Sequence, residues 1–256
     1  MSTAIALGAY RELALDGIDR ERVVAIWRYD ATVSRSQLIL PDGRMNLAAH
    51  CTTTSGSRLA AVWLALAGPA DTWRYLTVRP GVVSIGVRFR IGWGGTCLGV
   101  PAALMRNQWI AGRRVATLLG KSAHSILFAR SVEELQHGLV QAVARTASNA
   151  PVSLSHKRAI DTIDQAFGRK PRRIQLASRT LRHDVLAAAG IPLRSLAGIL
   201  RFQQAMSLLH EGVLSLKDIA SGLGYSDQSH MNREFRRFGG FAPSLRVSAP
   251  IVGAFT

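Results

Sequence analysis

The chain has few lysines, few cysteines and few acidic residues, and each shortage limits what the protein can be. Only four of its 32 basic residues are lysines, so positive charge is carried almost wholly by arginine. Arginine binds phosphate and guanine with two parallel hydrogen bonds, although a codon bias produces the same excess. The two cysteines, Cys51 and Cys97, are too few for a disulfide framework and lack the spacing of a zinc site. We expect both to be buried thiols.

A long hydrophobic run is also missing. The most apolar stretch, Leu59 to Ala67, is far too short to cross a bilayer. The apolar segment from Ala4 to Ala9 has no basic region ahead of it, and Glu12 follows soon after, which is unlike a signal peptide. The sequence therefore predicts a soluble, cytoplasmic protein without a membrane partner.

The charge of the chain is strongly positive. Its 256 residues suffice for one large or two ordinary domains, and the formal net charge is +16. Such a balance favours a polyanionic partner, with nucleic acid first and an anionic membrane surface second. Residues 1–150 hold 17 basic and 9 acidic residues, and residues 151–256 hold 15 and 7, so both halves carry +8. Charge alone does not locate the binding half, although the segment from Lys157 to Arg194 is locally denser in basic residues.

The amino-terminal half has the pattern of short β-strands. Residues 23–27 are β-branched and aromatic, and residues 38–40 run into the turn Pro41-Asp42-Gly43. Alternating apolar residues follow over 73–77 and again over 83–89. Several short strands separated by turns predict an antiparallel barrel or sandwich.

The pattern then changes to helices. Pro101 to Ile110 and Val132 to Ala147 are predicted as helices, and Asn149-Ala150-Pro151 is predicted as the domain boundary. A further helix is expected from Ser155 to Phe167 and ends before Pro171. We therefore expect an α+β protein with a β-rich sensor or oligomerisation domain over 1–150 and an all-helical domain over 151–256.

The segment from Leu214 to Pro243 carries the most information. Ser215 followed by Asp218 is a capping box at a helix start, and apolar residues then recur at helical spacing. Gly224 can end this helix in a left-handed conformation, and Ser226 can cap a second helix a few residues later. So short a connection makes two helices cross steeply, as in a helix-turn-helix.

The second helix of this pair is amphipathic. Its apolar residues Met231, Phe235 and Phe238 fall on one face, and its opposite face is polar and rich in arginine. The apolar face requires a core, whereas the polar face suits base edges in a major groove. A helical hairpin with a solvated basic face is the alternative for any such pattern.

The text GYSDQSHMNREFRRFGGFAP resembles the signature of the AraC/XylS family of bacterial transcription regulators, and the match runs from Leu214 to Arg246. The resemblance implies two helix-turn-helix units on a rigid linker helix. The first unit would span about 155–190, the linker helix about 192–210 and the second unit about 214–243. The two recognition helices would enter successive major grooves about 34–36 Å apart.

The same resemblance implies roles for individual residues. The residues expected to contact base edges are Gln228, Ser229, Asn232 and Arg233. Those expected to make backbone or secondary contacts are His230, Arg236 and Arg237 in the second unit and Arg179, Arg182 and His183 in the first. Asp227 and Glu234 are expected to be structural, by capping the helix or tempering repulsion among the arginines.

The first unit matches the family less well. The text Arg179-Thr180-Leu181-Arg182 resembles its recognition helix, but only Arg172 to Leu176 remain for the preceding helix. Ala177 stands where a capping serine is usual, and Asp184 stands where a basic residue is common. We therefore predict that the first helix-turn-helix is degenerate.

The amino-terminal half resembles the cupin-like sensors of one subgroup of the family through LPDGRMNL at Leu40 and RPGVVSIGVRFRI at Arg79. Arg88 and Arg90 would share one sheet face, where they either hold an anionic effector or are simply exposed. The five tryptophans all lie in this half; they are Trp27, Trp63, Trp73, Trp93 and Trp109. They either line a ligand pocket or belong to the core, which is the commoner position of aromatic residues in strands.

Together these patterns predict a sequence-specific DNA-binding transcription regulator that responds to an effector. No catalytic or metal-binding motif emerges, so no enzyme activity, cofactor or metal is expected. Double-stranded DNA is the expected partner, together with RNA polymerase, a small-molecule effector and a second copy of the chain. Two alternatives stay open: a DNA-repair or base-modifying protein that docks through the same module, and a sensor with weakened DNA binding that acts through protein contacts.

Overall fold

The computed structural model describes residues 9–53, 59–167, 178–244 and 251–252 of the chain. Its amino-terminal part is built on a six-stranded antiparallel sheet in the order β1-β2-β7-β4-β5-β8. The strands are β1 (Ala9–Leu13), β2 (Val23–Asp30), β7 (Val82–Phe89), β4 (Asn46–Thr53), β5 (Leu59–Ala67) and β8 (Trp109–Ala111). The β-rich domain expected from the sequence is thus confirmed.

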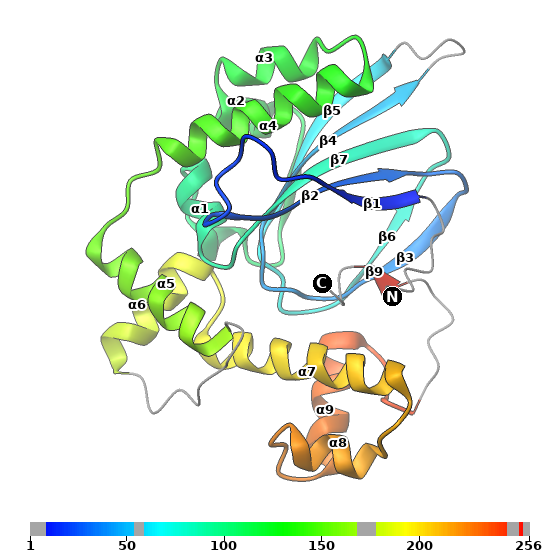
Figure 1. Cartoon of the computed structure of the whole chain (residues 1–256), viewed down its shortest axis with the longest axis vertical. Helices are drawn as coiled ribbons and strands as arrows, with labels where there is room; N and C mark the ends of the chain where they lie inside the picture. Colours follow the sequence, from blue (N-terminus) through cyan, green and yellow to red (C-terminus); the bar gives the residue numbers. More distant parts are fainter. Residues whose placement is uncertain (1–8, 54–58, 168–177, 245–250, 253–256) are drawn as a thin grey trace.

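A second, smaller sheet joins strands of the amino-terminal half to a strand near the carboxy-terminal end of the chain. Strand β6 (Arg74–Val78) pairs with β3 (Arg35–Ile39) in antiparallel fashion, and β9 (Ile251–Val252) pairs with β3 in parallel. Because β9 follows the helical region, the chain returns to the amino-terminal half after its last helix (Figure 1). The sequence pattern did not predict this strand.

Strand β7 is buried on both faces. On one face Ile85, Val87 and Phe89 are completely buried, as expected for the core-facing side of a strand. Arg88 on the opposite face is only 6% exposed. Of the two alternatives given for Arg88, an exposed sheet face is therefore wrong for this residue. Other parts of the chain, among them Tyr10, Glu12 and Asp42, contact Arg88 on this face.

Helices pack against the large sheet. They are α1 (Trp93–Leu98), α2 (Arg113–Leu119), α3 (Ser122–Leu127) and α4 (Val132–Ser148). Helix α4, predicted from the spacing of its apolar residues, begins at the cap Ser131 and buries Leu135, Leu139 and Val143 against β4 and β7. Cys51 and Cys97 are free thiols buried in this core, as expected.

The helix predicted over Pro101–Ile110 is wrong. Only a single 3₁₀ turn, η1 (Ala102–Met105), forms there, and the chain then reverses at Asn107, which has a φ of 56°. Residues 109–111 become strand β8 because they pair with residues 65–67 of β5. This long-range pairing outweighs the local spacing of apolar residues.

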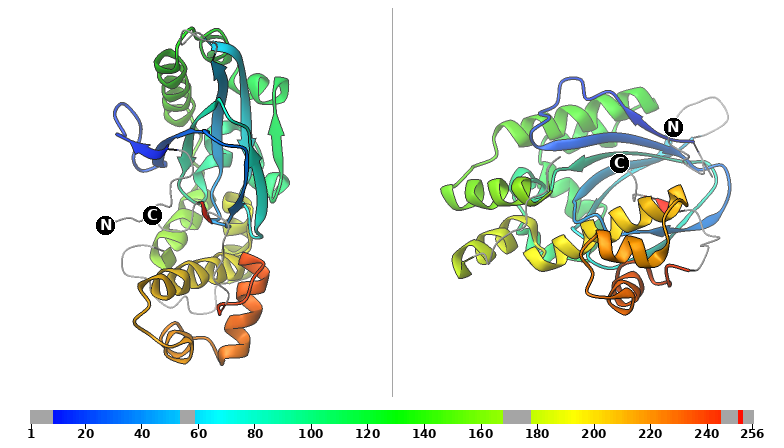
Figure 2. Two further views of the ribbon diagram at one scale, coloured as in Figure 1. Left: turned by 90° about the vertical axis from the view of Figure 1, so that its right-hand side faces the viewer. Right: turned by 60° about the horizontal axis from the view of Figure 1, so that its bottom comes forward.

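The carboxy-terminal part consists of helices. They are α5 (Leu154–Phe167), α6 (Arg179–Ala189), α7 (Leu193–Glu211), α8 (Leu216–Gly222) and α9 (Gln228–Gly239). Figure 1 shows α7 running from the α5–α6 pair to the α8–α9 pair, and Figure 2 shows the same arrangement from two other sides. The fold class expected from the sequence, a β-rich domain followed by an all-α domain, is therefore confirmed.

The two parts pack directly on one another. Leu38 and Leu40 of the amino-terminal half are buried in the hydrophobic core of the helical half, beside residues of α7. In addition, the Gln203 side chain of α7 donates a hydrogen bond to the Pro41 carbonyl at 3.0 Å. The chain between α4 and α5 covers residues 149–153, where the boundary was placed; a division at 150 into independent domains stays a prediction.

None of the helices in the described part of the chain is, by itself, long and apolar enough to cross a membrane. The pair α6 and α7 passes the same test of length and composition only when joined, and the two helices are bent by 64° relative to each other.

Gly190, between α6 and α7, provides a test of the contact between the two parts. Its φ is +72°, and a Cβ there would overlap the Ala102 carbonyl of η1. Gly190→Ala should therefore destabilise the fold by about 1–3 kcal/mol or more, and each kcal/mol lowers the melting temperature of a chain this size by about 2–4 °C. Gly224→Ala is the matched control, because Gly224 has a φ of +74° and nothing within 4 Å of the added atom. Equal losses in thermal unfolding would contradict the close packing at Gly190.

Candidate nucleic-acid interface

Helix α8 begins as its sequence indicates. The Ser215 hydroxyl oxygen accepts a hydrogen bond from the Asp218 backbone N–H at 3.2 Å, and the hydroxyl donates to the Asp218 carboxylate at 2.5 Å. Gly224, with a φ of +74°, turns the chain after α8, and Tyr225 N–H donates to the Ala220 carbonyl at 3.0 Å. The helix start and the glycine turn of the second unit are confirmed.

Helix α9 is capped by Asp227, one of the two roles expected for this residue, and not by Ser226. The Asp227 carboxylate accepts a hydrogen bond from the His230 backbone N–H at 2.6 Å. The bond from Tyr225 N–H to Ala220 extends the turn, so Ser226 comes one residue too early and instead donates its hydroxyl to Asp227 at 3.2 Å. The bond from the His230 N–H lowers the pKa of Asp227, so this cap stays ionised.

The inner face of α9 is fixed against α7. Met231, Phe235 and Phe238 are completely buried, and the ring of Phe202 in α7 lies 4.9 Å from that of Phe235. On the same side, Arg201 of α7 donates hydrogen bonds to both carboxylate oxygens of Glu234 at 2.9 and 3.2 Å. The apolar stripe and this charged pair together leave α9 little freedom to rotate, which suits a helix that must aim its opposite face.

The outer face of α9 brings the expected base-reading residues together. Gln228, Ser229, Arg233 and Arg236 are exposed, and Asn232 is half-buried. They recur with the spacing of one helix face, opposite the buried phenylalanines. Hydrogen-bonding side chains on an exposed, rigid helix are what a major groove can accept, and the individual roles stay predictions.

Two of the expected DNA contacts are engaged within the protein. The imidazole of His230 packs edge-on against Tyr225 with ring centroids 5.3 Å apart, and its Nε2 lies 3.8 Å from Glu234. Arg237 donates a hydrogen bond to the Ser195 hydroxyl at 3.1 Å and lies 3.6 Å from the carboxylate of Asp71. Its guanidinium remains about half exposed.

Asp71 connects the amino-terminal half to the recognition helix. It is 4% exposed, and its carboxylate accepts hydrogen bonds from Arg106 and from the Asn107 amide, the latter at 2.8 Å. Burial raises the pKa of Asp71, but these hydrogen bonds and the charges of Arg106 and Arg237 outweigh it and lower the pKa overall. Asp71 is therefore an anion that competes for Arg237. No local pattern pointed to this contact, because its partners lie more than a hundred residues apart.

The first unit is better capped than its sequence indicated. Ser178, one residue after the alanine noted at position 177, accepts a hydrogen bond from the Leu181 backbone N–H at 3.2 Å. Asp184, expected to be out of place, is buried and accepts a hydrogen bond from Arg158 of α5 at 3.0 Å. These two findings correct the expectation of an uncapped helix with a misplaced acid. Residues 172–177, where the preceding helix was expected, lie outside the described residues.

Helix α6 presents a small basic face. Arg179, Arg182 and His183 are exposed and follow one another at helical spacing. The helix itself is held by Asp184 toward α5 and by buried Val185 toward the helical core. The structure thus brings together the three residues expected for the first unit, while their contribution to DNA binding stays a prediction.

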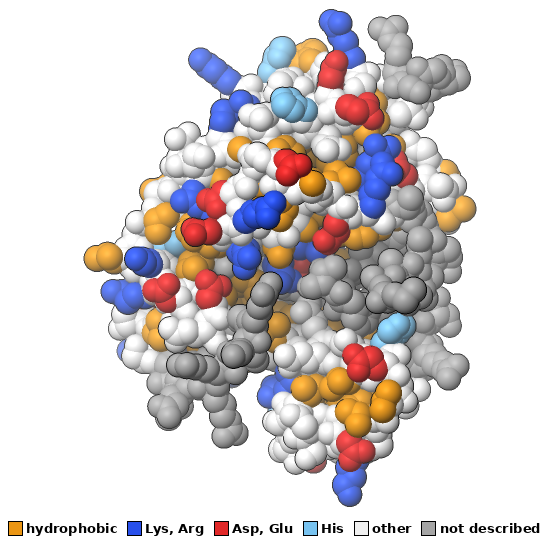
Figure 3. Space-filling model, viewed as in Figure 1, with side chains coloured by type: hydrophobic (Ala, Val, Ile, Leu, Met, Phe, Trp, Pro, Cys, Tyr) orange, Lys and Arg blue, Asp and Glu red, His pale blue; other side chains and the backbone are white. Residues whose placement is uncertain are grey.

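The charged side chains do not form one basic patch on the side seen in Figure 3. Arginine and lysine are interspersed with acidic side chains over the amino-terminal half on that side. On this side the excess of basic residues marks no extended surface, so the candidate interface is argued from the local arrangement on α6 and α9.

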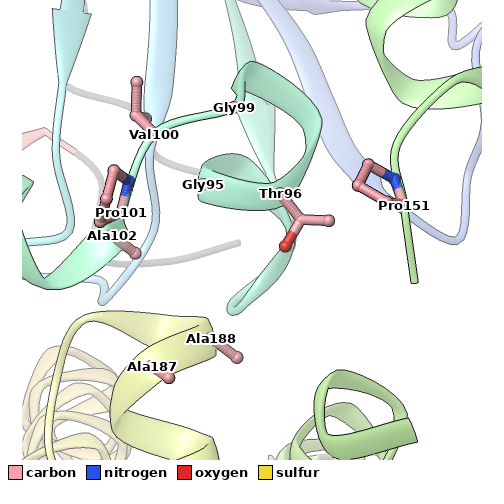
Figure 4. Close-up of a pocket in the computed structure, with 9 residues that line it drawn as sticks. All are labelled: Gly95, Thr96, Gly99, Val100, Pro101, Ala102, Pro151, Ala187 and Ala188. Carbon is pink, nitrogen blue, oxygen red and sulfur yellow. The ribbon is translucent and has the colours of Figure 1, made fainter. Parts of the chain in front are cut away.

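A cavity of about 350 Å³ lies between the two parts of the chain (Figure 4). It is lined by α1, the following loop, Pro151 and two alanines of α6, and Thr96 supplies the one polar side chain; the lining residues are Gly95, Thr96, Gly99, Val100, Pro101, Ala102, Pro151, Ala187 and Ala188. None of the five tryptophans lines it. Among the described residues, no group of three His, Cys, Asp or Glu side chains could hold a metal ion.

Comparison with known families identifies the helical region. Residues 171–245 match the family model described as "Helix-turn-helix domain", which is of the AraC type. The match begins within the first expected unit, 155–190, and covers all of the second, 214–243. The carboxy-terminal domain is an AraC-type helix-turn-helix domain. The resemblance stated from residues 214–246 is thereby confirmed, and the helix-turn-helix domain supports DNA binding.

Similar solved structures include ToxT from Vibrio cholerae in several forms. A 1.65 Å structure of ToxT is 12% identical over 92% of this chain and 97% of that chain, with a TM-score of 0.39. ToxT bound to an unsaturated fatty acid is 12% identical over 87% and 94% of the two chains, with a TM-score of 0.38. Among curated proteins, none matches the chain significantly.

The contact between Asp71 and Arg237 leads to a prediction about DNA binding by the helix-turn-helix domain. If Arg237 also binds phosphate, Asp71→Asn should free it and raise DNA affinity by up to about fivefold, since an ion pair of this exposure contributes roughly 0.2–1 kcal/mol. Arg237→Ala should then cost more affinity in the Asp71→Asn background than in the original chain. Asp161→Asn, on the exposed side of α5, controls for the loss of one negative charge. Equal effects of the two substitutions in a mobility-shift titration would show that Asp71 does not restrain Arg237.

Proposed function

We propose that this chain is a sequence-specific regulator of transcription of the AraC/XylS type that binds double-stranded DNA and responds to a small-molecule effector. The observation that carries the proposal is α9, whose apolar face is locked onto α7 while its exposed face holds Gln228, Asn232 and Arg233. An ordinary basic hairpin needs no such separation of a fixed face from a hydrogen-bonding one. The match to the helix-turn-helix family supports the same function.

The first turns of α9 are proposed to contact bases, since the start of a recognition helix lies deepest in the groove. Gln228 and Asn232 can pair bidentately with adenine, and Arg233 with guanine, while Ser229 can bond either kind of edge. Arg236, nearer the end of α9, is proposed to contact phosphate, as are Arg237 when released from Asp71 and His230. In the first unit, Arg179, Arg182 and His183 take the phosphate role.

The proposal separates base readers from phosphate contacts. Arg233→Ala should cost about 1–3 kcal/mol of binding and relax preference at one base pair, because a bidentate guanine contact is lost. Arg236→Ala should weaken binding to all sequences alike and reduce the salt slope by about one unit. Competition binding against a randomised site, repeated at several salt concentrations, measures both effects. A uniform loss of affinity in both variants would mean that Arg233 does not read a base.

The first helix-turn-helix unit should contribute electrostatic attraction to the DNA backbone more than preference for a particular base sequence. Replacing Arg179 and Arg182 together by alanine should lower affinity and flatten the salt slope by about two units, because about two phosphate contacts are lost. The preferred sequence should stay the same. Selection of binding sites from a random library tests this. A selected site with two equally strong blocks, one of them erased in the double variant, would show that α6 reads bases as well.

The remaining partners follow from the regulator type. We propose a cytoplasmic location, a second copy of the chain and RNA polymerase as partners. Of the alternatives, a repair or base-modifying enzyme needs a reactive group, and the thiols of Cys51 and Cys97 are buried with their pKa raised by desolvation to about 11. A mobility-shift assay of the full chain with genomic fragments tests the other alternative. A sensor that has lost DNA binding would shift none of the fragments.

A further inference from the structure

Three arginines converge where the large and the small sheet meet. Arg44 lies in the connection from β3 to β4, Arg74 is the first residue of β6, and Arg88 is near the end of β7. Arg74 is paired in register with Ile39, and Arg88 with Asn46, so both lie beside the ends of the same short connection, residues 40–45. We call Arg44, Arg74 and Arg88 the arginine cluster.

Negative charge near the arginine cluster comes from two residues. Asp42 lies 3.7 Å from Arg88, and Glu12 lies 3.6 Å from Arg88. All sixteen acidic side chains of the protein belong to the described residues, and none of their carboxylate oxygens lies within 4.0 Å of the guanidinium nitrogens of Arg44 or Arg74. The Nε atoms of Arg44 and Arg74 are buried and have no hydrogen-bond partner in the described part of the chain.

This arrangement leaves positive charge uncompensated. Arg44 is repelled by Arg88 and by the nearby Arg90, while Asp42 and Glu12 attract it. Burial is the largest influence on Arg44 and on Arg74, and it lowers the pKa of both. Taking a guanidinium out of water costs free energy unless an anion accompanies it. In this cluster three arginines face two carboxylates, both of which lie beside Arg88.

An aromatic surface borders the cluster. The Tyr10 hydroxyl accepts a hydrogen bond from Arg88 at 3.3 Å and donates one to Glu12 at 3.0 Å. The ring of Tyr10 stacks on that of Trp27 with centroids 6.4 Å apart. An anionic group bound by the arginines would thus have flat apolar surface beside it for the rest of a small molecule.

We propose that Arg44, Arg74 and Arg88 bind the oxyanion of the small-molecule effector, a carboxylate or a phosphate. The inference rests on the proposed function in that it names the chemical class of the effector. Guanidinium groups pair with both oxyanions through two parallel hydrogen bonds, and the buried Nε atoms are the donors left for them. The anion would share the cluster with Asp42 and supply the countercharge that Arg44 and Arg74 lack.

The position of the cluster connects it to the DNA-binding domain. The Pro41 carbonyl accepts a hydrogen bond from Gln203 of α7, and Gly43 packs so closely on Leu196 of α7 that a Cβ would lie 2.8 Å from it. Asp42 stands between these two contacts and also accepts the Arg44 backbone N–H at 2.9 Å. An anion that draws Arg44 and Arg88 away from Asp42 therefore acts on the turn that touches α7.

Thermal unfolding of the full-length chain tests the site. Inorganic phosphate and butyrate are titrated separately in the millimolar range against chloride at matched ionic strength. In the original chain at least one of them should raise the melting temperature and saturate. Arg44→Gln/Arg74→Gln should abolish the saturable rise, and Arg114→Gln, an exposed arginine of α2, should keep it. The anion that saturates identifies the preferred oxyanion.

The direction in which the substitutions change the melting temperature without added anion distinguishes a binding site from a structural role. In chloride alone, Arg74→Gln and the double variant should melt higher than the original chain, because uncompensated buried charge is removed. A structural arginine would give lower melting in chloride and in phosphate alike, which overturns the proposal. The proposal is also overturned if neither anion raises the melting temperature in a saturable way, or if the original chain and the double variant respond alike.

A mobility-shift titration keeps this inference separate from the proposed function. The double variant should bind DNA like the original chain without added anion, and only the original chain should change its DNA affinity when the saturating anion is present. An anion response without any DNA binding would contradict the regulator function and leave the anion site standing. DNA binding without an anion response would overturn the anion site alone.

Discussion

The packing of helix α7 is the constraint on which the rest of the structure depends. Phe202, at its centre, is completely buried against Phe235 and Phe238 of α9, and the amino-terminal end of α7 follows α6 after a bend of 64°. The same helix carries Arg201, which holds Glu234 on the side of α9 that faces α7. One element therefore sets the direction of both recognition helices, and a rigid distance between them is what two successive grooves require.

The acidic residues have an internal role in a protein with so much positive charge. Asp184, Glu234 and Asp71 are mostly buried, and each binds an arginine of another element. These pairs position helices, since a carboxylate with two directed hydrogen bonds restricts both partners. The arginines that have no such partner on α6 and α9 remain exposed, and these are the ones proposed to meet phosphate. The division between positioning and binding arginines is thus decided by where the few acids lie.

The second helix-turn-helix could be predicted in detail because its signals are local. A cap, a glycine turn and an apolar stripe each involve residues within four positions of one another, and the buried Met231, Phe235 and Phe238 were all anticipated. The predictions that were wrong depended instead on contacts between residues farther apart in the sequence. Strand β8 formed in place of a helix because β5 lies beside it. Of the two caps considered for α9, Asp227 and not Ser226 is used, because Tyr225 N–H bonds back to Ala220. Arg88 contacts Asp42 and Glu12, which lie 46 and 76 positions earlier in the chain. A local sequence pattern cannot predict contacts over such separations.

The amino-terminal half touches both DNA-binding units, and this gives an effector two points on which to act. Gly190 at the end of α6 rests on the Ala102 carbonyl, and Arg237 near the end of α9 faces Asp71. Both contacts arise from one side of the β-rich part, since Ala102 and Arg106 belong to the same short segment after α1 and Arg106 holds Asp71. A shift of this segment relative to α7 would change the support of α6 and release or capture Arg237 together. Coupling of this kind needs no change inside either helix, because Phe202 of α7 packs on Phe235 and Phe238 of α9, and Arg158 of α5 holds Asp184 of α6. Only the contacts of the two helices with the sensor half would vary.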